Sequence, residues 1–336
     1  MSFILLSNYI KKMKKNQESK THLEKITDRK LKNEKLLNIA SSLKNKEKIK
    51  MSKKTLENIK DCGTWLEFLA DKKLEKRKLN AGTFCTNRFC PICSKKKAVK
   101  DAVEIKIMTE YIKHELNREF ILLTLTAPNV NGEQLSEEIV KYNKAFKKFL
   151  ERDKYKKVIK GYLRKLEVTY NNKKKDKSYD TYHPHFHVLI SVDKSYFKGG
   201  IYIAQQEWLK DWQEVMDDNS ITQVDVRRLK TKTKDLLDKS ILELTKYIAK
   251  DSNYLENEQV FEYFYKGLKS KRQYAFGGDF KVAREKLKNG KLEKYYIKDE
   301  TEWYWKLTNK WQNGQYSEKQ EKLTEKEKAK LQKEKK

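Results

Sequence analysis

The 336-residue sequence has no apolar run that approaches the ~20 residues a helix needs to span a bilayer. Its first residues place apolar side chains before the charges, which is the reverse of a secretory signal, and no cleavage site follows. We therefore expect a cytoplasmic protein without a membrane partner. In that compartment the four cysteines should be reduced, so their presence favours metal ligation over disulfides.

Proline and glycine are absent from residues 1–60, which are rich in Lys, Asn, Glu and Leu. A segment of this composition buries little apolar surface, and we interpret it as an extension that is partly disordered or loosely helical. Residues 316–336 have the same charged character. For both ends, a solubilising charged helix is favoured over a specific binding role.

Negative charge is in short supply. The chain has 77 Lys and Arg residues against 48 Asp and Glu residues, which gives a formal net charge of +29. A field of this sign and size suits a polyanionic partner. Nucleic acid is the expected partner, and an anionic membrane surface is the alternative.

Between the charged ends, the hydrophobic pattern alternates between strand and helix periods. It predicts strands at 120–128, 161–171, 185–192 and 221–229, and helices at 134–152, 203–216 and 236–251. The order β-α-β-β-α-β-α indicates an α+β fold with an antiparallel-rich central sheet and helices on one face. A small Cys-rich module is expected before it.

Three of only five histidines alternate in the segment YHPHFHVLI, at His183, His185 and His187. Successive side chains of a strand point to opposite faces, so these imidazoles project together while Phe186 faces the core. Two imidazoles at i and i+2 on a rigid strand can hold one divalent ion. Histidines on an exposed sheet face are the alternative.

A third ligand would come from a neighbouring strand. If the strand at 161–171 pairs with the histidine strand, Glu167 can face the same side. A mixed set of nitrogen and oxygen ligands suits Mn or Mg. Glu167 could equally be an ordinary solvent-facing glutamate, and His183 competes with it for the third position.

The predicted helix 236–251 carries Glu243 and Tyr247 at i and i+4, on one helical face. Lys246 and Lys250 lie on an adjoining stripe, where we expect them to contact DNA phosphates. A tyrosine beside a metal and lysines can attack phosphate, and a nearby carboxylate can act as a base. The alternative is a half-buried aromatic side chain without a catalytic role.

The four cysteines are Cys62, Cys85, Cys90 and Cys93, and the last two form the knuckle CPIC. Two pairs of thiolates suit a tetrahedral structural Zn site, although the first pair is loosely spaced. Unligated, partly buried thiols are the alternative. The adjacent run SKKK and Arg88 suggest that this module contacts DNA.

The segments FILLTLTAP, YHPHFHVLI and ELTKYIAKDSNY together resemble the three motifs of the HUH endonuclease superfamily. More closely, they resemble the rolling-circle replication initiators of small Gram-positive plasmids that use one tyrosine and one glutamate. The cysteine segment FCTNRFCPICSKKKA is similar to that family too. The resemblance covers about residues 60–310, and four motifs in the same order make it specific.

The resemblance implies a role for each motif. His185 and His187 would be the metal ligands of the HUH pair. Tyr247 would nick the plasmid double-strand origin and become joined to the 5′-phosphate, leaving a 3′-OH that primes synthesis. Glu243 would activate water for the terminating cleavage. Host helicase and DNA polymerase would be partners.

We accordingly expect four parts: a Lys-rich extension (1–60), a Cys-rich zinc module (61–100), an HUH nicking and joining domain (101–315), and a charged tail (316–336). A conjugative relaxase or transposase with the same chemistry is one alternative, and a zinc-knuckle DNA-binding regulator without catalysis is another. A relaxase usually has its tyrosine near the N-terminus, whereas Tyr247 follows the histidines. The regulator leaves the histidine strand unexplained.

Overall fold

The structure is a computed structural model that describes residues 20–229, 250–296 and 299–333. By packing, the chain forms two compact units. One combines both ends of the chain, Met1–Val99 and Tyr296–Lys336, and the other is Lys100–Tyr295. The four-part division predicted from the sequence rests on the expected role of each segment. That division stays a prediction.

The unit Lys100–Tyr295 contains most of the predicted strands and helices. Its strands are β3 (Arg118–Thr126), β4 (Ile159–Asn171), β5 (Thr181–Asp193), β6 (Val224–Arg228) and β7 (Tyr274–Gly278). Its helices are the C-terminal part of α4 (Pro91–Glu115), α5 (Leu135–Glu151), α6 (Asp153–Val158), α7 (Gln205–Met216), α9 (Glu258–Leu268) and α10 (Asp279–Lys288). Short 3-10 helices are η1 (Lys194–Phe197), η2 (Lys250–Leu255) and η3 (Glu293–Tyr295).

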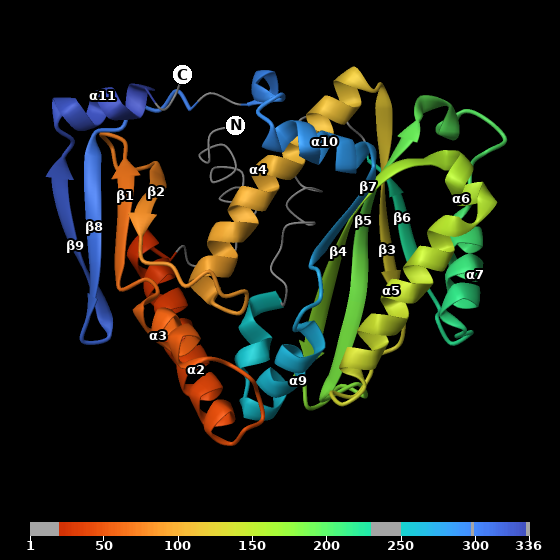
Figure 1. Cartoon of the computed structure of the whole chain (residues 1–336), viewed down its shortest axis with the longest axis horizontal. Helices are drawn as coiled ribbons and strands as arrows, with labels where there is room; N and C mark the ends of the chain where they lie inside the picture. The colour runs from red at the N-terminus through yellow and green to blue at the C-terminus, as the bar shows by residue number, and fades with distance from the viewer. Residues whose placement is uncertain (1–19, 230–249, 297–298, 334–336) are drawn as a thin grey trace. The chain divides into compact units, whose positions relative to one another are not determined.

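These strands form one antiparallel sheet in the order β6-β3-β5-β4-β7. The histidine strand β5 is central, between β3 and β4. Helices α5 and α7 lie together on one side of this sheet (Figure 1). The predicted α+β class with an antiparallel sheet is confirmed, and the six predicted elements between 120 and 229 are present with small shifts at their ends. The predicted helix 236–251 lies almost wholly outside the described residues.

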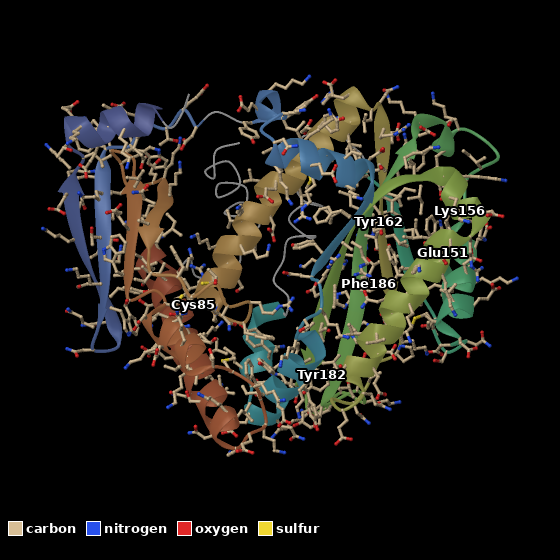
Figure 2. All side chains as sticks on the ribbon, in the orientation of Figure 1. Cys85, Glu151, Lys156, Tyr162, Tyr182 and Phe186 are labelled. Carbon is tan, nitrogen blue, oxygen red and sulfur yellow. The ribbon has the colours of Figure 1, made fainter. Side chains whose placement is uncertain are left out.

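Phe186 of β5 points into the core beneath α5, as its alternation with the histidines predicts (Figure 2). The rings of Tyr142 and Phe146 on α5 lie nearly perpendicular to it, with centroids 5.3 and 5.6 Å away. Trp212 of α7 packs on Tyr142 at 5.6 Å. Edge-to-face aromatic packing of this kind fixes the sheet against its helices, and it leaves the histidines on the opposite face.

The opposite face is covered at one end by α10. Its Phe280 packs on Phe120 of β3, with ring centroids 6.2 Å apart. Its Asp279 carboxylate accepts hydrogen bonds from Arg118 at 3.2 Å and from Ser191 at 3.0 Å. Ser191 is four residues along β5 from the last histidine of the motif, a distance of roughly 13 Å.

The unit formed by both chain ends has a second antiparallel sheet, in the order β2-β1-β8-β9. Its elements are α2 (His22–Asn45), α3 (Lys53–Asp61), β1 (Trp65–Ala70), β2 (Arg77–Gly82), the start of α4, β8 (Trp305–Gln312), β9 (Gln315–Lys322) and α11 (Glu325–Lys333). One core cluster joins Ile26 of α2 to Phe68 and Leu307 of the sheet. Strand pairing between β1 and β8 thus ties residues near 65 to residues near 310.

Helix α2 packs more closely than its composition suggested. A capping box starts it: the Thr21 hydroxyl accepts the Glu24 N–H, and the Glu24 carboxylate accepts the Thr21 N–H. Its buried stripe includes Leu36 and Leu43, but also Lys30 and Asn33. These two polar residues interrupt the apolar period, which is why the sequence pattern indicated a solvated helix.

Candidate functional site

Pairing of β4 with β5 places Glu167 directly opposite His185. The Oε2 atom of Glu167 lies 3.1 Å from Nε2 of His187 and 3.5 Å from Nε2 of His185. All three groups offer ligand atoms within 4.8 Å of one another and are buried or nearly so. Adjacent ligands of an octahedral ion bound at about 2.1 Å lie about 3.0 Å apart, so this spacing fits a divalent ion.

Both imidazoles are held by their other ring nitrogen. The Nδ1–H of His185 donates to the carbonyl oxygen of His183 at 3.2 Å. The Nδ1 of His187 shares a hydrogen bond with the Thr124 hydroxyl at 3.3 Å. An outer partner of this kind fixes the ring and leaves Nε2 free to ligate. The residues present therefore fit a bound metal.

Burial by itself would raise the pKa of the Glu167 carboxyl. The hydrogen bonds with His185 and His187 and the charge of Lys165 outweigh burial, so the net direction of the pKa is well below the ordinary value. Lys165 is fully buried, and its Nζ lies 4.0 Å from Oε2 of Glu167. Glu167 is thus an ionised carboxylate, the form that ligates a cation.

His183 is held differently. Its Nε2 shares a hydrogen bond with the hydroxyl of Thr126. Burial, together with the neighbouring His185, lowers the pKa of His183 to about 4. Its nitrogens do not belong to the group formed by Glu167, His185 and His187 among the described residues. The geometry therefore favours Glu167 over His183 as the third member.

Sequence reasoning missed the residues that hold the histidine side chains and Glu167 in place. Thr124 and Thr126 come from β3, which pairs with β5 so that Thr124 lies opposite His187 and Thr126 opposite His185. The alternation LTLT within an otherwise apolar strand is the signal that could have found them. Lys165 is two residues from Glu167, so period-2 reasoning would have placed it on the same face.

Four predicted residues cannot be placed beside this group. Tyr247, Glu243 and Lys246 lie outside the described residues. Lys250 is the first residue of η2, and its side chain is likewise not described. Their roles therefore remain those implied by the resemblance.

The four cysteines form a second compact group. The sulfur of Cys62 lies 3.5 Å from that of Cys90 and 3.6 Å from that of Cys93, and the sulfurs of Cys85 and Cys93 are 3.6 Å apart. Four sulfurs bound to zinc at ~2.3 Å lie about 3.8 Å apart at the corners of a tetrahedron. All four sulfurs are within 4.8 Å of one another, so the residues present fit a zinc ion.

The surroundings of these sulfurs suit thiolates. The backbone of Cys85, Thr86 and Asn87 lies near the sulfurs of Cys62, Cys93 and Cys85, respectively, where it favours the ionised form of each thiol. Thr86 adopts a φ of 55°, a strained backbone conformation for a β-branched residue. Cys90 and Cys93 also flank the N-terminus of α4, where the helix dipole favours negative charge.

Without a cation, the close packing of the four thiols makes it unfavourable to ionise all of them. Hydrogen bonding among the sulfurs and burial raise the pKa of the Cys90 thiol far above its ordinary value. A bound divalent ion removes this conflict because it pairs with each thiolate. Arg88, between the two cysteine pairs, is half-buried, and burial lowers its pKa.

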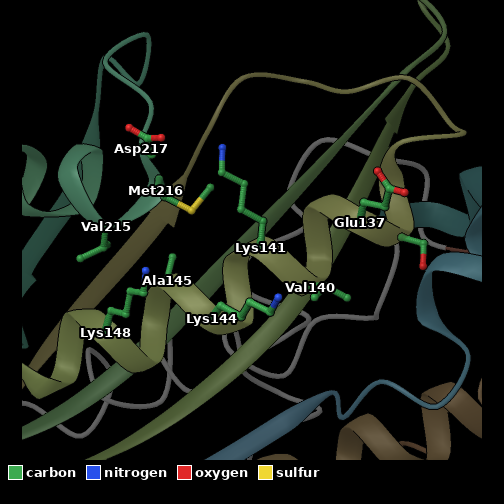
Figure 3. A pocket seen from close by; sticks show the side chains of 10 residues that line it. Glu137, Val140, Lys141, Lys144, Ala145, Lys148, Val215, Met216 and Asp217 are labelled. Atoms are coloured by element: carbon green, nitrogen blue, oxygen red, sulfur yellow. The ribbon is translucent and has the colours of Figure 1, made fainter.

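An open groove of about 490 Å³ runs between α5 and the end of α7 (Figure 3). Lys141, Lys144 and Lys148 line it along α5, and Val215 and Met216 line it from α7. Because α5 packs on the Phe186 side of the sheet, this groove is separated from the histidines by the sheet itself. Among the described helices, none has both the length and the apolar character needed to cross a membrane.

Residues 76–322 match a family model described as "Replication protein". A "Protein rep" from Staphylococcus aureus is 48% identical over 204 residues, covering 60% of this chain and 85% of the relative. A "Protein rep" from Streptococcus pneumoniae serotype 2 is 36% identical over 242 residues, covering 71% of this chain and 73% of the relative. A third, from Bacillus sp, is 34% identical over 260 residues, with 71% and 83% covered. No solved structure matches.

Proposed function

Because this chain belongs to the replication protein family, we propose that it initiates rolling-circle replication of a plasmid by nicking one strand of the origin and joining itself to the 5′ end. The observation that carries the proposal is the group formed by Glu167, His185 and His187 on one face of the central sheet. A regulator without catalysis has no use for a carboxylate buried between two oriented imidazoles. A nicking enzyme does.

The three ligands would hold Mg or Mn, which would supply polarisation of the scissile phosphate and stabilisation of charge in the transition state. The protein's own part is orientation. Thr124 and the carbonyl of His183 fix the two rings, and Lys165 fixes the carboxylate from the buried side. Ligands held in this way bind without first being ordered.

Tyr247 would be the nucleophile. Its phenolic oxygen forms a bond to the scissile phosphorus as the bond to the 3′ oxygen breaks. The phenolic proton leaves during attack, and the departing oxygen gains a proton to become a free 3′-OH. One phosphodiester is thus exchanged for another, so the reaction can be reversed and the strand rejoined. The free 3′-OH would prime the host DNA polymerase, after a host helicase opens the duplex.

Glu243, one helical turn from Tyr247 in the predicted helix, would serve the last step. When replication regenerates the origin, Tyr247 still carries DNA, so a second nucleophile is needed. A carboxylate is ionised at neutral pH and can accept a proton from water as the water attacks phosphorus. This cut forms no new covalent link between protein and DNA, so it would end replication instead of restarting it.

Cys62, Cys85, Cys90 and Cys93 would hold a structural zinc, which has four protein ligands and no open position. This ion would fold the loop that carries Arg88, which we propose as a DNA contact. Lys246 and Lys250 would contact phosphates beside the tyrosine. The partner in all these contacts is the plasmid double-strand origin, in keeping with the net charge of +29.

Incubation with supercoiled plasmid carrying the candidate origin, in Mg or Mn, tests the proposal. We expect relaxed circles and a protein–DNA adduct that resists denaturant. Peptide mapping should place the adduct on Tyr247, and Tyr247→Phe should abolish it while DNA binding persists. Tyr254→Phe is the matched control on the same stretch of chain. An adduct on Tyr254, or nicking that persists in EDTA, would overturn the assignment.

A further inference from the structure

Helix α2 directs two polar side chains into the interior of its unit, towards the cysteine group. Lys30 has 1% of its surface exposed and Asn33 has none. A lysine is almost never fully buried unless something compensates its charge. Both residues precede the segment 76–322 that matches the replication protein family, so the family match gives them no role.

Asn33 makes a direct hydrogen bond to one of the four sulfurs. Its Nδ2 donates to the sulfur of Cys90 at 3.4 Å. A hydrogen bond of this kind stabilises a thiolate more than a thiol.

Lys30 brings a positive charge to the same place. Its Nζ donates to the carbonyl oxygens of Lys60 and Cys62 at 2.9 and 3.0 Å, and to Oδ1 of Asn33 at 3.3 Å. These acceptors are neutral, so hydrogen bonding alone leaves the ammonium charge uncompensated. Burial opposes this charge, whereas the Glu34 carboxylate attracts it most, followed by the sulfurs of Cys62 and Cys90 and then by Asp61.

Four thiolates around a zinc ion carry a net charge of about −2, which is costly to bury. We propose that Lys30 and Asn33 are positioning residues of the zinc centre, with Lys30 offsetting its negative charge and Asn33 donating to Cys90. This inference rests on the proposed zinc site. It makes α2 part of the metal module, so that zinc binding and the docking of α2 stabilise each other.

A purely structural role for Lys30 predicts something else. The carbonyls of Lys60 and Cys62 stand at the C-terminal end of α3, where helices leave carbonyl groups without partners. If Lys30 only satisfies these carbonyls, its loss weakens the protein equally with and without zinc. If Lys30 offsets the charge of the zinc centre, its loss weakens zinc binding. The zinc-free protein should not lose stability, because burying an ammonium group without a compensating charge is itself unfavourable.

The test compares zinc affinity in full-length wild type, Lys30→Met and Asn33→Leu, using competition with a chromophoric chelator. Lys32→Met and Asn38→Leu are matched controls on the exposed side of the same helix. We expect Lys30→Met and Asn33→Leu, the two inward variants, to bind zinc about 10–100-fold more weakly than wild type, as is typical when a residue that supports a metal ligand is replaced. The control variants should bind zinc as tightly as wild type. Thermal unfolding of the zinc-free forms should not show Lys30→Met to be less stable than wild type.

Cobalt substitution gives a readout that simple loss of packing would not move. Removal of the N–H donor makes the Cys90 sulfur more electron-rich, so Asn33→Leu should shift the sulfur-to-cobalt charge-transfer band to lower energy than in wild type. Hydrogen exchange should show α2 protected by zinc in wild type and less so in the inward variants. If wild type binds zinc and both inward variants match it in affinity and spectrum, the inference fails. If wild type itself takes up no zinc or cobalt, the proposed zinc site fails first.

Discussion

The carboxylate of Glu167 lies 3.1 Å from Nε2 of His187, across two antiparallel strands whose register brings them to one face. The two residues are twenty positions apart in the chain. Their proximity depends on the pairing of β4 with β5, and both side chains are largely buried. This relationship joins a motif that is visible in the sequence to a ligand that only strand pairing can supply.

Removal of one imidazole should separate binding from chemistry. We expect His187→Ala to lower nicking of supercoiled origin DNA by roughly 100-fold or more, because the metal supplies several kcal/mol of transition-state stabilisation. Calorimetry with Mn should show weakened ion binding, while origin affinity stays close to wild type. His114→Ala, at an exposed histidine on α4, is the control and should behave as wild type. Wild-type nicking by His187→Ala would refute the metal assignment.

Glu243→Gln tests whether Tyr247 performs the first cut and water activated by Glu243 performs the second. The amide keeps the size of the side chain but cannot accept a proton as a base. The variant should still nick supercoiled DNA and form the tyrosyl adduct, yet fail to terminate. Replication assays should then give products longer than one plasmid unit. Unit-length products from this variant would show that another group activates the water.

Zinc content and stability should change together. Protein purified without chelator should hold about one zinc per chain, and Cys93→Ser should lower that content and the melting temperature, because metal binding contributes to folding free energy. Ser94→Ala, the adjacent position, is the control. Atomic absorption and thermal unfolding provide the two measurements. Well-folded wild type without zinc would contradict the prediction.

DNA affinity should fall steeply with salt because phosphate contacts release counterions. The net charge of +29 makes several such contacts expected. Arg88→Gln should reduce the slope of log K against log salt by about 1 if Arg88 meets a phosphate. Zinc content and melting temperature of the variant show whether it is folded, since Arg88 is half-buried. An unchanged slope in a folded variant would remove Arg88 from the DNA contacts.

The buried side chain of His22 should make the stability of the unit formed by the chain ends sensitive to acid. Burial, and then the charges of Arg77, Arg29 and Lys25, lower the pKa of His22 to about 3. Its ring packs edge-on to Phe68, with centroids 4.5 Å apart. The unfolded chain, with a histidine pKa of ~6.5, binds this proton more readily than the folded one, so stability should fall as pH drops from about 6.5 towards 3.

The measurement for His22 is the change in melting temperature between pH 7 and pH 5. His22→Leu removes this titration, so its melting temperature should fall less over that interval than that of wild type. Comparison of the two changes isolates His22 from the other titratable groups, which are the same in both proteins. An equal fall in both would show that His22 is not a source of acid sensitivity.

The sequence by itself determined four of the five strands of the central sheet and the histidine pair. The apolar run FILLTLTAP identifies one strand. Alternation with a period of two in YHPHFHVLI identifies a second strand and assigns its faces. The same pattern placed Phe186 inward and His185 and His187 together. The cysteine spacing likewise pointed to a tetrahedral site, because ligand type and count are local properties.

The sequence offered both Glu167 and His183 as the third member of the histidine group, and the tertiary structure brings Glu167 to it. Glu167 joins the histidines through strand register, and Thr124 orients His187 from the other neighbouring strand. Asn33 contacts Cys90, which is 57 residues further along the chain, and Lys30 contacts the carbonyl oxygen of Cys62. Both come from a helix whose composition indicated a solvated extension. Periodicity reports only which face a residue occupies. What packs against that face depends on contacts between residues far apart in the chain. Buried polar residues such as Lys30 and Asn33 interrupt the apolar stripe of a helix, so the sequence pattern does not identify the face as buried.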